Sequence, residues 1–225
     1  MPVIDLAKSP IRDLNCTLHA LPGNTNETSW TVRNPAGRHS IAVGVDAPIE
    51  IEIDGHVGYY CAGMNKHAEI TINGNAGVGL AENMMSGVVR VKGDASQAAG
   101  ATGQGGLLVI EGNASARCGI SMKGIDIVVK GSIGSMSAFM AQAGSLVVLG
   151  DAGEALGDSI YEARLFVRGE VKSLGADCEE KVIGDEERTI LSDVLDRAGI
   201  DVPIDGFRLY GSARRLYHFH IDNAY

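Results

Sequence analysis

Residues 108–114 of the chain read Leu-Val-Ile-Glu-Gly-Asn-Ala, and closely similar stretches lie 19 residues away on either side. Residues 89–95 are Val-Arg-Val-Lys-Gly-Asp-Ala, and residues 127–133 are Ile-Val-Val-Lys-Gly-Ser-Ile. The glycine of this stretch recurs at 19-residue intervals, at Gly55, Gly74, Gly93, Gly112, Gly131, Gly150 and Gly169. Self-similarity at a fixed period of this size indicates a repeat fold, in which one structural unit is stacked many times.

Aliphatic side chains occupy two positions of every repeat. Two residues before the glycine stand Ile53, Ile72, Val91, Ile110, Val129, Val148 and Val167. Four residues before it stand Ile51, Ile70, Val89, Leu108, Ile127, Leu146 and Leu165. Aliphatic residues spaced by two are typical of a strand with one buried face. We therefore expect one short strand per repeat, with both positions pointing inward.

Two further positions of the repeat predict corners. The residue after each glycine is polar, as in Gly-Asn and Gly-Asp pairs, which form turns in which we expect the glycine to adopt a positive φ. Seven residues after each glycine only alanine or glycine occurs, at Ala62, Ala81, Gly100, Gly119, Ala138, Gly157 and Ala176. Such small residues predict a tight corner where backbone passes close to backbone.

A unit with one short strand and two corners has the size of one coil of a parallel β-helix. Propeller blades need roughly 40 residues, and ankyrin or tetratricopeptide units carry a helical pattern that is absent here. The sequence therefore predicts an all-β protein, a right-handed parallel β-helix (a single-stranded solenoid) of about seven 19-residue coils. Coils about 4.8 Å apart would make a prism roughly 30 Å long.

The repeat spans residues 49–180, and we expect the segments on either side to cap it. Within residues 1–48 we predict a helix at about 9–21, with Ser9 as its N-cap and Pro10 at its first position. Lead-in strands follow this helix, and the clearest is Ser-Ile-Ala-Val-Gly-Val at residues 40–45.

Residues 181–225 are expected to form a C-terminal helix and a docking tail. The helix should run from Asp185 to Ala198 and end at Gly199. The last 19 residues, 207–225, interleave aromatic with basic residues, namely Phe207, Arg208, Tyr210, Arg214, Arg215, Tyr217, His218, Phe219, His220 and Tyr225. This mixture is typical of interfaces. The tail either folds back over the flank of the solenoid or docks into another subunit.

Composition and charge exclude several classes of function. Thirty glycines in 225 residues, about twice the usual share, fit a turn-dense repeat rather than a disordered chain. A formal net charge of −9 argues against a nucleic-acid partner. No apolar run approaches the roughly 18 residues of a membrane span, and the N-terminus lacks the apolar core of a secretory signal. We expect a cytoplasmic protein without a membrane or nucleic-acid role.

The candidate chemical motifs are weak. Gly77-Val-Gly79 and Gly103-Gln-Gly105 lack the following helix of a dinucleotide site. His218 and His220 share a face on a strand but have no third metal ligand at a convincing spacing. We therefore assign no catalytic, cofactor-binding or metal-binding residue to this chain.

The four cysteines, Cys16, Cys61, Cys118 and Cys178, are interpreted as structural thiols of a reducing compartment. Arg117 could lower the pKa of Cys118, but the small-residue surroundings of this cysteine favour burial. Cys61 and Cys118 lie three coils apart, about 14 Å, so they cannot form a disulfide, which needs Cα atoms within roughly 7 Å.

The methionines suggest a contact edge. All six internal ones, Met64, Met84, Met85, Met122, Met136 and Met140, lie in the repeat, and five of them fall nine to eleven residues after a repeat glycine. Stacking would gather them along one edge of the solenoid, either as core filling or as a soft surface for a partner.

Residues 59–106 and 117–178, with their glycine blocks, resemble the glycine-repeat (GXGXG) β-helix domain of glutamate synthase. The chain carries this domain alone, as do the free-standing small subunits of glutamate-synthase-like complexes, and it is most similar to the free-standing β-helix subunit of N-methylglutamate synthase. The resemblance implies two partners, an amidotransferase-like subunit and a subunit that holds FMN and an iron–sulfur cluster.

By this resemblance the hetero-oligomeric complex would convert methylamine and L-glutamate to N-methyl-L-glutamate and ammonia. This chain would be a non-catalytic scaffold without a cofactor of its own. The alternatives are the equivalent subunit of an ammonia-dependent glutamate synthase-like complex or of a formylmethanofuran dehydrogenase, which also contains a β-helix subunit of this kind. An independent β-helix enzyme such as a polysaccharide lyase would need clustered carboxylates or basic residues on one sheet, which the strand columns lack.

Overall fold

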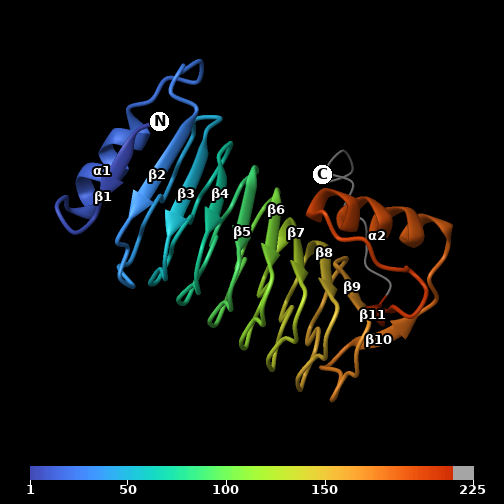
Figure 1. The fold of residues 1–225 in the computed structure, drawn as a ribbon. Coiled ribbons are helices and arrows are strands. Elements are labelled where there is room, and N and C mark those ends of the chain that lie inside the picture. The colour runs from blue at the N-terminus through green and yellow to red at the C-terminus, as the bar shows by residue number, and fades with distance from the viewer. Residues whose placement is uncertain (215–225) are drawn as a thin grey trace, which may run out of the picture.

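The computed structural model describes residues 1–214, which form a parallel solenoid with two helices (Figure 1). All eleven strands join one sheet in the order β1-β2-β3-β4-β5-β6-β7-β8-β9-β11-β10. The strands are β1 Val3–Asp5, β2 Ser29–Arg33, β3 Glu50–Asp54, β4 Glu69–Ile72, β5 Val88–Val91, β6 Leu107–Ile110, β7 Lys123–Val129, β8 Ala143–Val148, β9 Arg164–Val167, β10 Cys178–Lys181 and β11 Arg208–Ser212. The helices are α1 Ile11–His19 and α2 Asp185–Ala198.

The 19-residue period is the register of the sheet. Ile51 pairs with Ile70, and Leu108 pairs with Ile127, each 19 residues further along the chain. Both aliphatic columns point inward, and each of their fourteen side chains is at most 1% exposed. A second line of contact runs two residues after each glycine, where Val57 through Val171 form parallel bridges from coil to coil. The predicted solenoid of about seven coils is confirmed.

Steric crowding between stacked coils, rather than a positive φ, requires glycine at the repeat positions. Of the seven, only Gly55 has a positive φ, of 133°, so the expectation was wrong for the other six. A Cβ atom on Gly74 would lie 2.6 Å from the carbonyl carbon of Gly55, and one on Gly150 would lie 2.7 Å from that of Gly131. Stacked coils bring these corners so close that no side chain fits between them.

The polar residue after each glycine forms a hydrogen-bonded ladder along the solenoid. In each pair, the backbone N–H of one coil donates to the side chain of the preceding coil, over 2.7–3.0 Å. The members in order are His56, Asn75, Asp94, Asn113, Ser132, Asp151 and Glu170. The accepting atom also fills the corner, since a Cβ on Gly150 would lie 2.6 Å from Ser132 Oγ.

A left-handed arc follows this corner in each of the first six repeats. The residues five, seven and nine after the glycine all have a positive φ, as Tyr60, Ala62 and Met64 do in the first repeat, with φ of 59°, 56° and 55°. The predicted small-residue corner is therefore confirmed as the middle of the arc in these repeats. Its residues are buried there, whereas Ala176 in the last repeat is exposed.

Residues 40–45 are such an arc and not the strand that we expected. Ser40, Ala42 and Gly44 have positive φ, and the N–H groups of Ser40 and Gly44 donate to Tyr59 O and Gly63 O over 2.7 Å. Ile41, Val43 and Val45 have the sequence spacing of a strand, but in the arc the adjacent residues Ile41 and Ala42 are both 0% exposed while Val43 is only partly buried. An extra coil thus precedes the first repeat, and its strand is β2, which pairs in parallel with β3.

Helix α1 closes the N-terminal end of the solenoid (Figure 1). It begins at Ile11 after Pro10 as N-cap, not after Ser9, whose N–H donates to Asp5 O over 3.0 Å. Leu14 and Leu18 are at most 1% exposed and pack on the inner core.

The polar side of α1 takes the place of a preceding coil, because the arc at residues 40–45 is the first arc of the solenoid. Asn15 Nδ2 donates to Ser40 O over 2.8 Å, and His19 Nε2 donates to Val43 O over 2.6 Å. The helix therefore donates to carbonyls of the first arc, whereas in later arcs a carbonyl such as Gly63 O accepts from the preceding coil.

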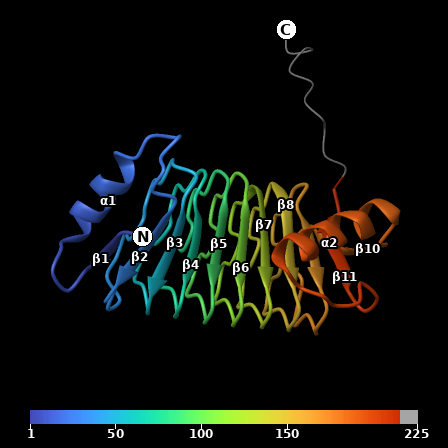
Figure 2. The same cartoon turned by 45° about the horizontal axis from the view of Figure 1, so that its top comes forward.

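Helix α2 has the predicted bounds and ends at Gly199, which has φ of 71°. It lies along the outer face of the sheet rather than across the end of the solenoid (Figure 2). Its buried side chains form a second core with outward-facing residues of the strands, among them Val109, Val128, Val147 and Phe166.

The first part of the aromatic segment belongs to the fold. Strand β11 inserts antiparallel between β9 and β10, and Phe207 and Tyr210 are 6% and 3% exposed. Residues 207–212 therefore fold back on the solenoid. Residues 215–225, with Tyr217, His218, Phe219, His220 and Tyr225, lie outside the described part of the chain.

We predict that Gly150→Ala lowers the free energy of unfolding by about 1–3 kcal/mol, because its methyl group would collide with the backbone of Gly131 and with Ser132. Urea unfolding followed by circular dichroism measures the loss. Gly23→Ala is the control, since no atom lies within 4 Å of a Cβ at that position. Equal stability of the two variants would contradict the close-stacking account.

Candidate interaction surfaces

The described cysteines do not gather into a ligand set. All four are free, and residues 1–214 hold no group of three His, Cys, Asp or Glu side chains that could bind a metal ion. Cys61 and Cys118 lie in arcs three coils apart, Cys16 is on α1, and Cys178 is on β10. These thiols do not fit an iron–sulfur cluster, and the expected absence of a Cys61–Cys118 disulfide is confirmed.

Burial makes the thiols of the two arc cysteines, Cys61 and Cys118, unreactive. Desolvation raises the pKa of Cys61 and of Cys118 to about 12. Arg117 stands in the left-handed conformation, with φ of 61°, and is exposed, while Cys118 beside it is fully buried. The burial of Cys118 outweighs any activation by Arg117, which supports the structural interpretation of this thiol.

The Gly-x-Gly motifs are packed corners. A Cβ on Gly77 would lie 2.6 Å from the carbonyl carbon of Gly58, and one on Gly103 would lie 2.8 Å from Ile125 Cγ2. No helix follows either motif, so neither has the helix N-terminus of a phosphate site. The glycines leave no room for a phosphate and do not form a nucleotide site.

The arcs present a surface with few charged side chains, which are Arg117, Glu82 and Asp158. We call the residues five and nine after the six glycines Gly55 to Gly150 the arc face, which comprises Tyr60, Met64, Gly79, Asn83, Ala98, Thr102, Arg117, Ser121, Met136, Met140, Ala155 and Ser159. All twelve have a positive φ, and Arg117 is the single charged member. Sequence reasoning missed this surface, because only the middle position of the arc, seven residues after the glycine, is uniformly small.

The expected methionine edge divides between core and surface. Met84 and Met122, ten residues after their glycines, are 0% exposed and fill the core. Met64 and Met140, nine residues after theirs, are 51% and 39% exposed. Core filling is thus correct for Met84 and Met122, and the exposed column leaves the soft contact surface as a prediction.

Two tyrosines are held rigidly at the N-terminal end of the arc face. The Tyr59 ring stacks on His39 with centroids 4.4 Å apart, and the Tyr59 N–H donates to His39 Nδ1 over 2.8 Å. The Tyr60 ring lies over Gly79, where a Cβ would be 2.7 Å from Tyr60 Cδ1. Both rings are about half exposed, so this end offers ordered aromatic surface to a partner.

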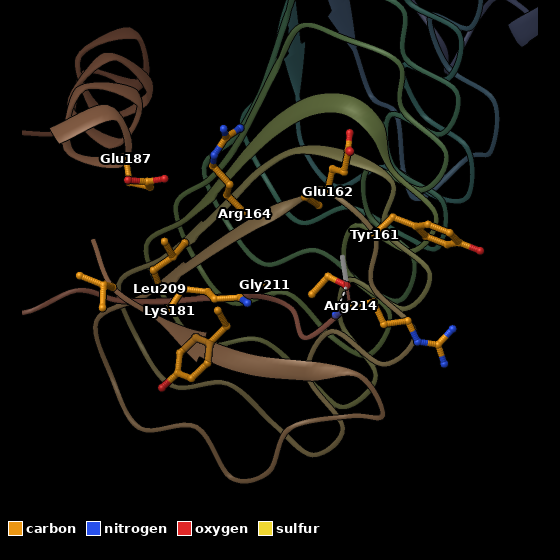
Figure 3. A pocket seen from close by; sticks show the side chains of 12 residues that line it. Tyr161, Glu162, Arg164, Lys181, Glu187, Leu209, Gly211 and Arg214 are labelled. Atoms are coloured by element: carbon orange, nitrogen blue, oxygen red, sulfur yellow. Dashed lines mark hydrogen bonds between the residues drawn. The ribbon is translucent and has the colours of Figure 1, made fainter. Parts of the chain in front are cut away.

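A groove of about 630 Å³ opens at the C-terminal end, beside the start of α2 (Figure 3). Its floor includes Gly211 of β11, with Arg164 and Lys181 among the lining residues (Figure 3). The described chain ends at Arg214 on its rim. The groove arises from the insertion of β11 between β9 and β10, which no sequence pattern predicted.

The cations of the groove are already neutralised. Arg164 pairs with Glu186 over 2.9 Å, Lys181 with Glu179 over 2.5 Å and Arg214 with Asp177 over 2.5 Å. The lining is therefore mixed in charge and does not form an anion site.

We predict that a maleimide reagent labels Cys16 of the native protein at pH 8 but leaves Cys61 and Cys118 unmodified. With a pKa of about 12, only about one such thiol in ten thousand is ionised at this pH. Peptide mass spectrometry locates the label, and urea-unfolded protein is the control in which all should react. Native labelling of Cys118 would contradict its burial.

Comparison with known proteins identifies a full-length relative. The chain is 62% identical to Protein GlxC of Rhizobium meliloti (strain 1021) over 225 residues, which cover 100% of this chain and 99% of the relative. No family model matches the chain. None of the helices in residues 1–214 is long and apolar enough to cross a membrane.

Proposed function

The chain belongs to the GlxC family, and we propose that it serves as a non-catalytic structural subunit of an enzyme assembly. The observation that carries this proposal is the packing of the repeat. The inner columns fill the solenoid with aliphatic side chains, and the glycine corners stack backbone on backbone. Function is therefore left to the outer surfaces, which is where a scaffold works.

We propose further that the assembly is a glutamate-synthase-like enzyme of the N-methylglutamate synthase type, in the cytoplasm. The resemblance of the glycine blocks to the GXGXG domain supports this assignment. The chain would bridge an amidotransferase-like subunit and a subunit with FMN and an iron–sulfur cluster. The scattered thiols support a cluster site in the partner rather than here. An ammonia-dependent glutamate synthase-like complex and a formylmethanofuran dehydrogenase are the alternatives.

Reconstitution tests the assignment. We expect the purified chain alone to be colourless and inactive, and its addition to the two partner subunits to give methylamine-dependent formation of N-methyl-L-glutamate. Ammonia-dependent glutamate formation by the same mixture would favour the first alternative, and co-purification with molybdopterin proteins the second. Methylamine-dependent turnover by the chain alone would contradict the scaffold role.

Removal of residues 215–225 tests the tail without damage to the sheet, because the truncation spares β11. We expect the shortened chain to keep its melting temperature within about 2 °C, since no described core residue is lost. Its binding to the partner subunits should weaken at least tenfold, as measured by native mass spectrometry. Truncation before Phe207 is the contrasting variant, and it should unfold the C-terminal end. Unchanged assembly after removal of 215–225 would contradict a docking tail.

A further inference from the structure

Arg117 of the arc face and Glu82 beside it have no charged partner within the described chain. The Arg117 side chain is exposed and Glu82 is partly exposed, and neither side chain makes an ion pair or hydrogen bond among residues 1–214. Asp158 differs, because its carboxylate accepts from Ser159 Oγ over 2.8 Å. Glu82 lies two coils before Arg117, about 10 Å away along the solenoid. Two opposite charges on one surface are therefore available to a partner.

The carboxylate of Glu82 lies in the same column of the solenoid as Arg117. A Cβ on Gly79 would be 2.9 Å from Glu82 Oε2 and 2.7 Å from Tyr60 Cδ1, so the carboxylate lies over Gly79 beside the tyrosine ring. Gly79 and Arg117 each stand five residues after a repeat glycine. The negative and the positive charge thus lie on one line parallel to the solenoid axis, with one coil between them.

The large apolar side chains of the arc face form two groups in two shared columns. Tyr60 and Met64 belong to the coil of Gly55, and Met136 and Met140 occupy the same columns four coils later, about 19 Å away. Tyr60, Met64 and Met140 are 48%, 51% and 39% exposed. Exposed apolar groups of this size gain free energy by burial against another surface.

A twofold axis across the coil of Gly93 would bring a second copy into register with both features. An axis that lies in the plane of the face and perpendicular to the solenoid reverses the order of the coils, so that coils equally far from the axis face each other. The two apolar groups would then lie opposite each other, and Arg117 of each copy would lie opposite Glu82 of the other. Ala98 and Thr102, on the axis itself, are small enough for the faces to approach closely.

The apolar groups and the charges select this axis independently. An antiparallel copy centred on any other coil would separate the two apolar groups. In one such register Arg117 would face Asp158, which already binds Ser159, and Tyr60 would lie beyond the arc face of the second copy. In a parallel arrangement each coil would face itself, and Arg117 would lie opposite Ser121 without a carboxylate. A single arrangement therefore satisfies both features.

We propose that the arc face is the interface of an antiparallel homodimer, held by two Arg117–Glu82 ion pairs and by contact of the Tyr60/Met64 group with the Met136/Met140 group. The matched face spans seven coils, from the arc at 40–44 to the arc at 155–159, a length of about 29 Å. This inference goes beyond the scaffold role and does not depend on it. The C-terminal ends of the two copies would point in opposite directions, so each groove would remain open.

Reversal of the two charges tests the interface in the full-length chain. Arg117→Glu and Glu82→Arg should each raise the dissociation constant of the homodimer at least about tenfold, because like charges then face each other. An equimolar mixture of the two variants should dimerise again, with a dissociation constant within about threefold of the wild-type value, because opposite charges meet at both positions. Sedimentation velocity at about 1–100 µM protein measures the association.

Arg168→Glu is the matched control. Arg168 is exposed, has no ion pair among residues 1–214 and lies outside the arc face, and its replacement changes the net charge as Arg117→Glu does. This variant should dimerise like the wild-type chain.

The double variant Met64→Gln, Met140→Gln tests the apolar contact without a change of charge. It removes the most exposed methionine of each group. We expect its dissociation constant to rise at least about tenfold, with an unchanged melting temperature, because both side chains lie on the surface of the monomer. This variant also decides the matter if a charge variant proves less stable than the wild-type chain.

Three results would overturn the homodimer. They are a wild-type chain that stays monomeric at about 100 µM, charge variants that dimerise like the wild-type chain, and a mixture of the two charge variants that stays monomeric. A monomeric chain that binds a different protein through the arc face would also overturn it, while leaving the scaffold function intact.

Discussion

The close contact between successive backbones governs the whole molecule. Because each glycine corner rests on the corner before it, a coil of the repeat closes after 19 residues and stacks without side chains between the corners. The ladder from His56 to Glu170 adds a hydrogen bond between neighbouring coils at this point. The register then places the aliphatic columns in the interior and the arc face outside. A coil of a different length would move the aliphatic columns and the arc face out of register together, since side chains alternate along a strand.

The sequence predicts the parts of this structure that depend on the period. The glycine interval, the two buried columns and α2 follow from spacing alone, and each is confirmed. The parts it does not predict depend on backbone conformation and distant pairing. The arc at 40–45 has Ile41, Val43 and Val45 at the spacing of a strand, although its left-handed backbone buries the adjacent residues Ile41 and Ala42. The insertion of β11 between β9 and β10 brings together segments about 30 residues or more apart, without a motif.

The ends of the solenoid differ in how they are closed, and the difference bears on assembly. At the N-terminal end, α1 supplies apolar side chains to the core and donors to Ser40 O and Val43 O. At the C-terminal end, α2 lies on the outer face, and β10 and β11 complete the sheet beside an open groove. The candidate contact surfaces are therefore the arc face and the C-terminal end, while the described interior is packed. Such a distribution suits the proposed role of a rigid spacer in an assembly.

Hydrogen–deuterium exchange of the chain, free and in the assembled complex, tests the scaffold account most directly. In the free chain the strands β3–β9 should already be protected by coil-to-coil hydrogen bonds. Assembly should add protection mainly at the C-terminal end, in the peptides that contain residues 212–225, and leave the peptide with residues 50–54 unchanged. New protection confined to residues 50–54, or no change on assembly, would contradict the account.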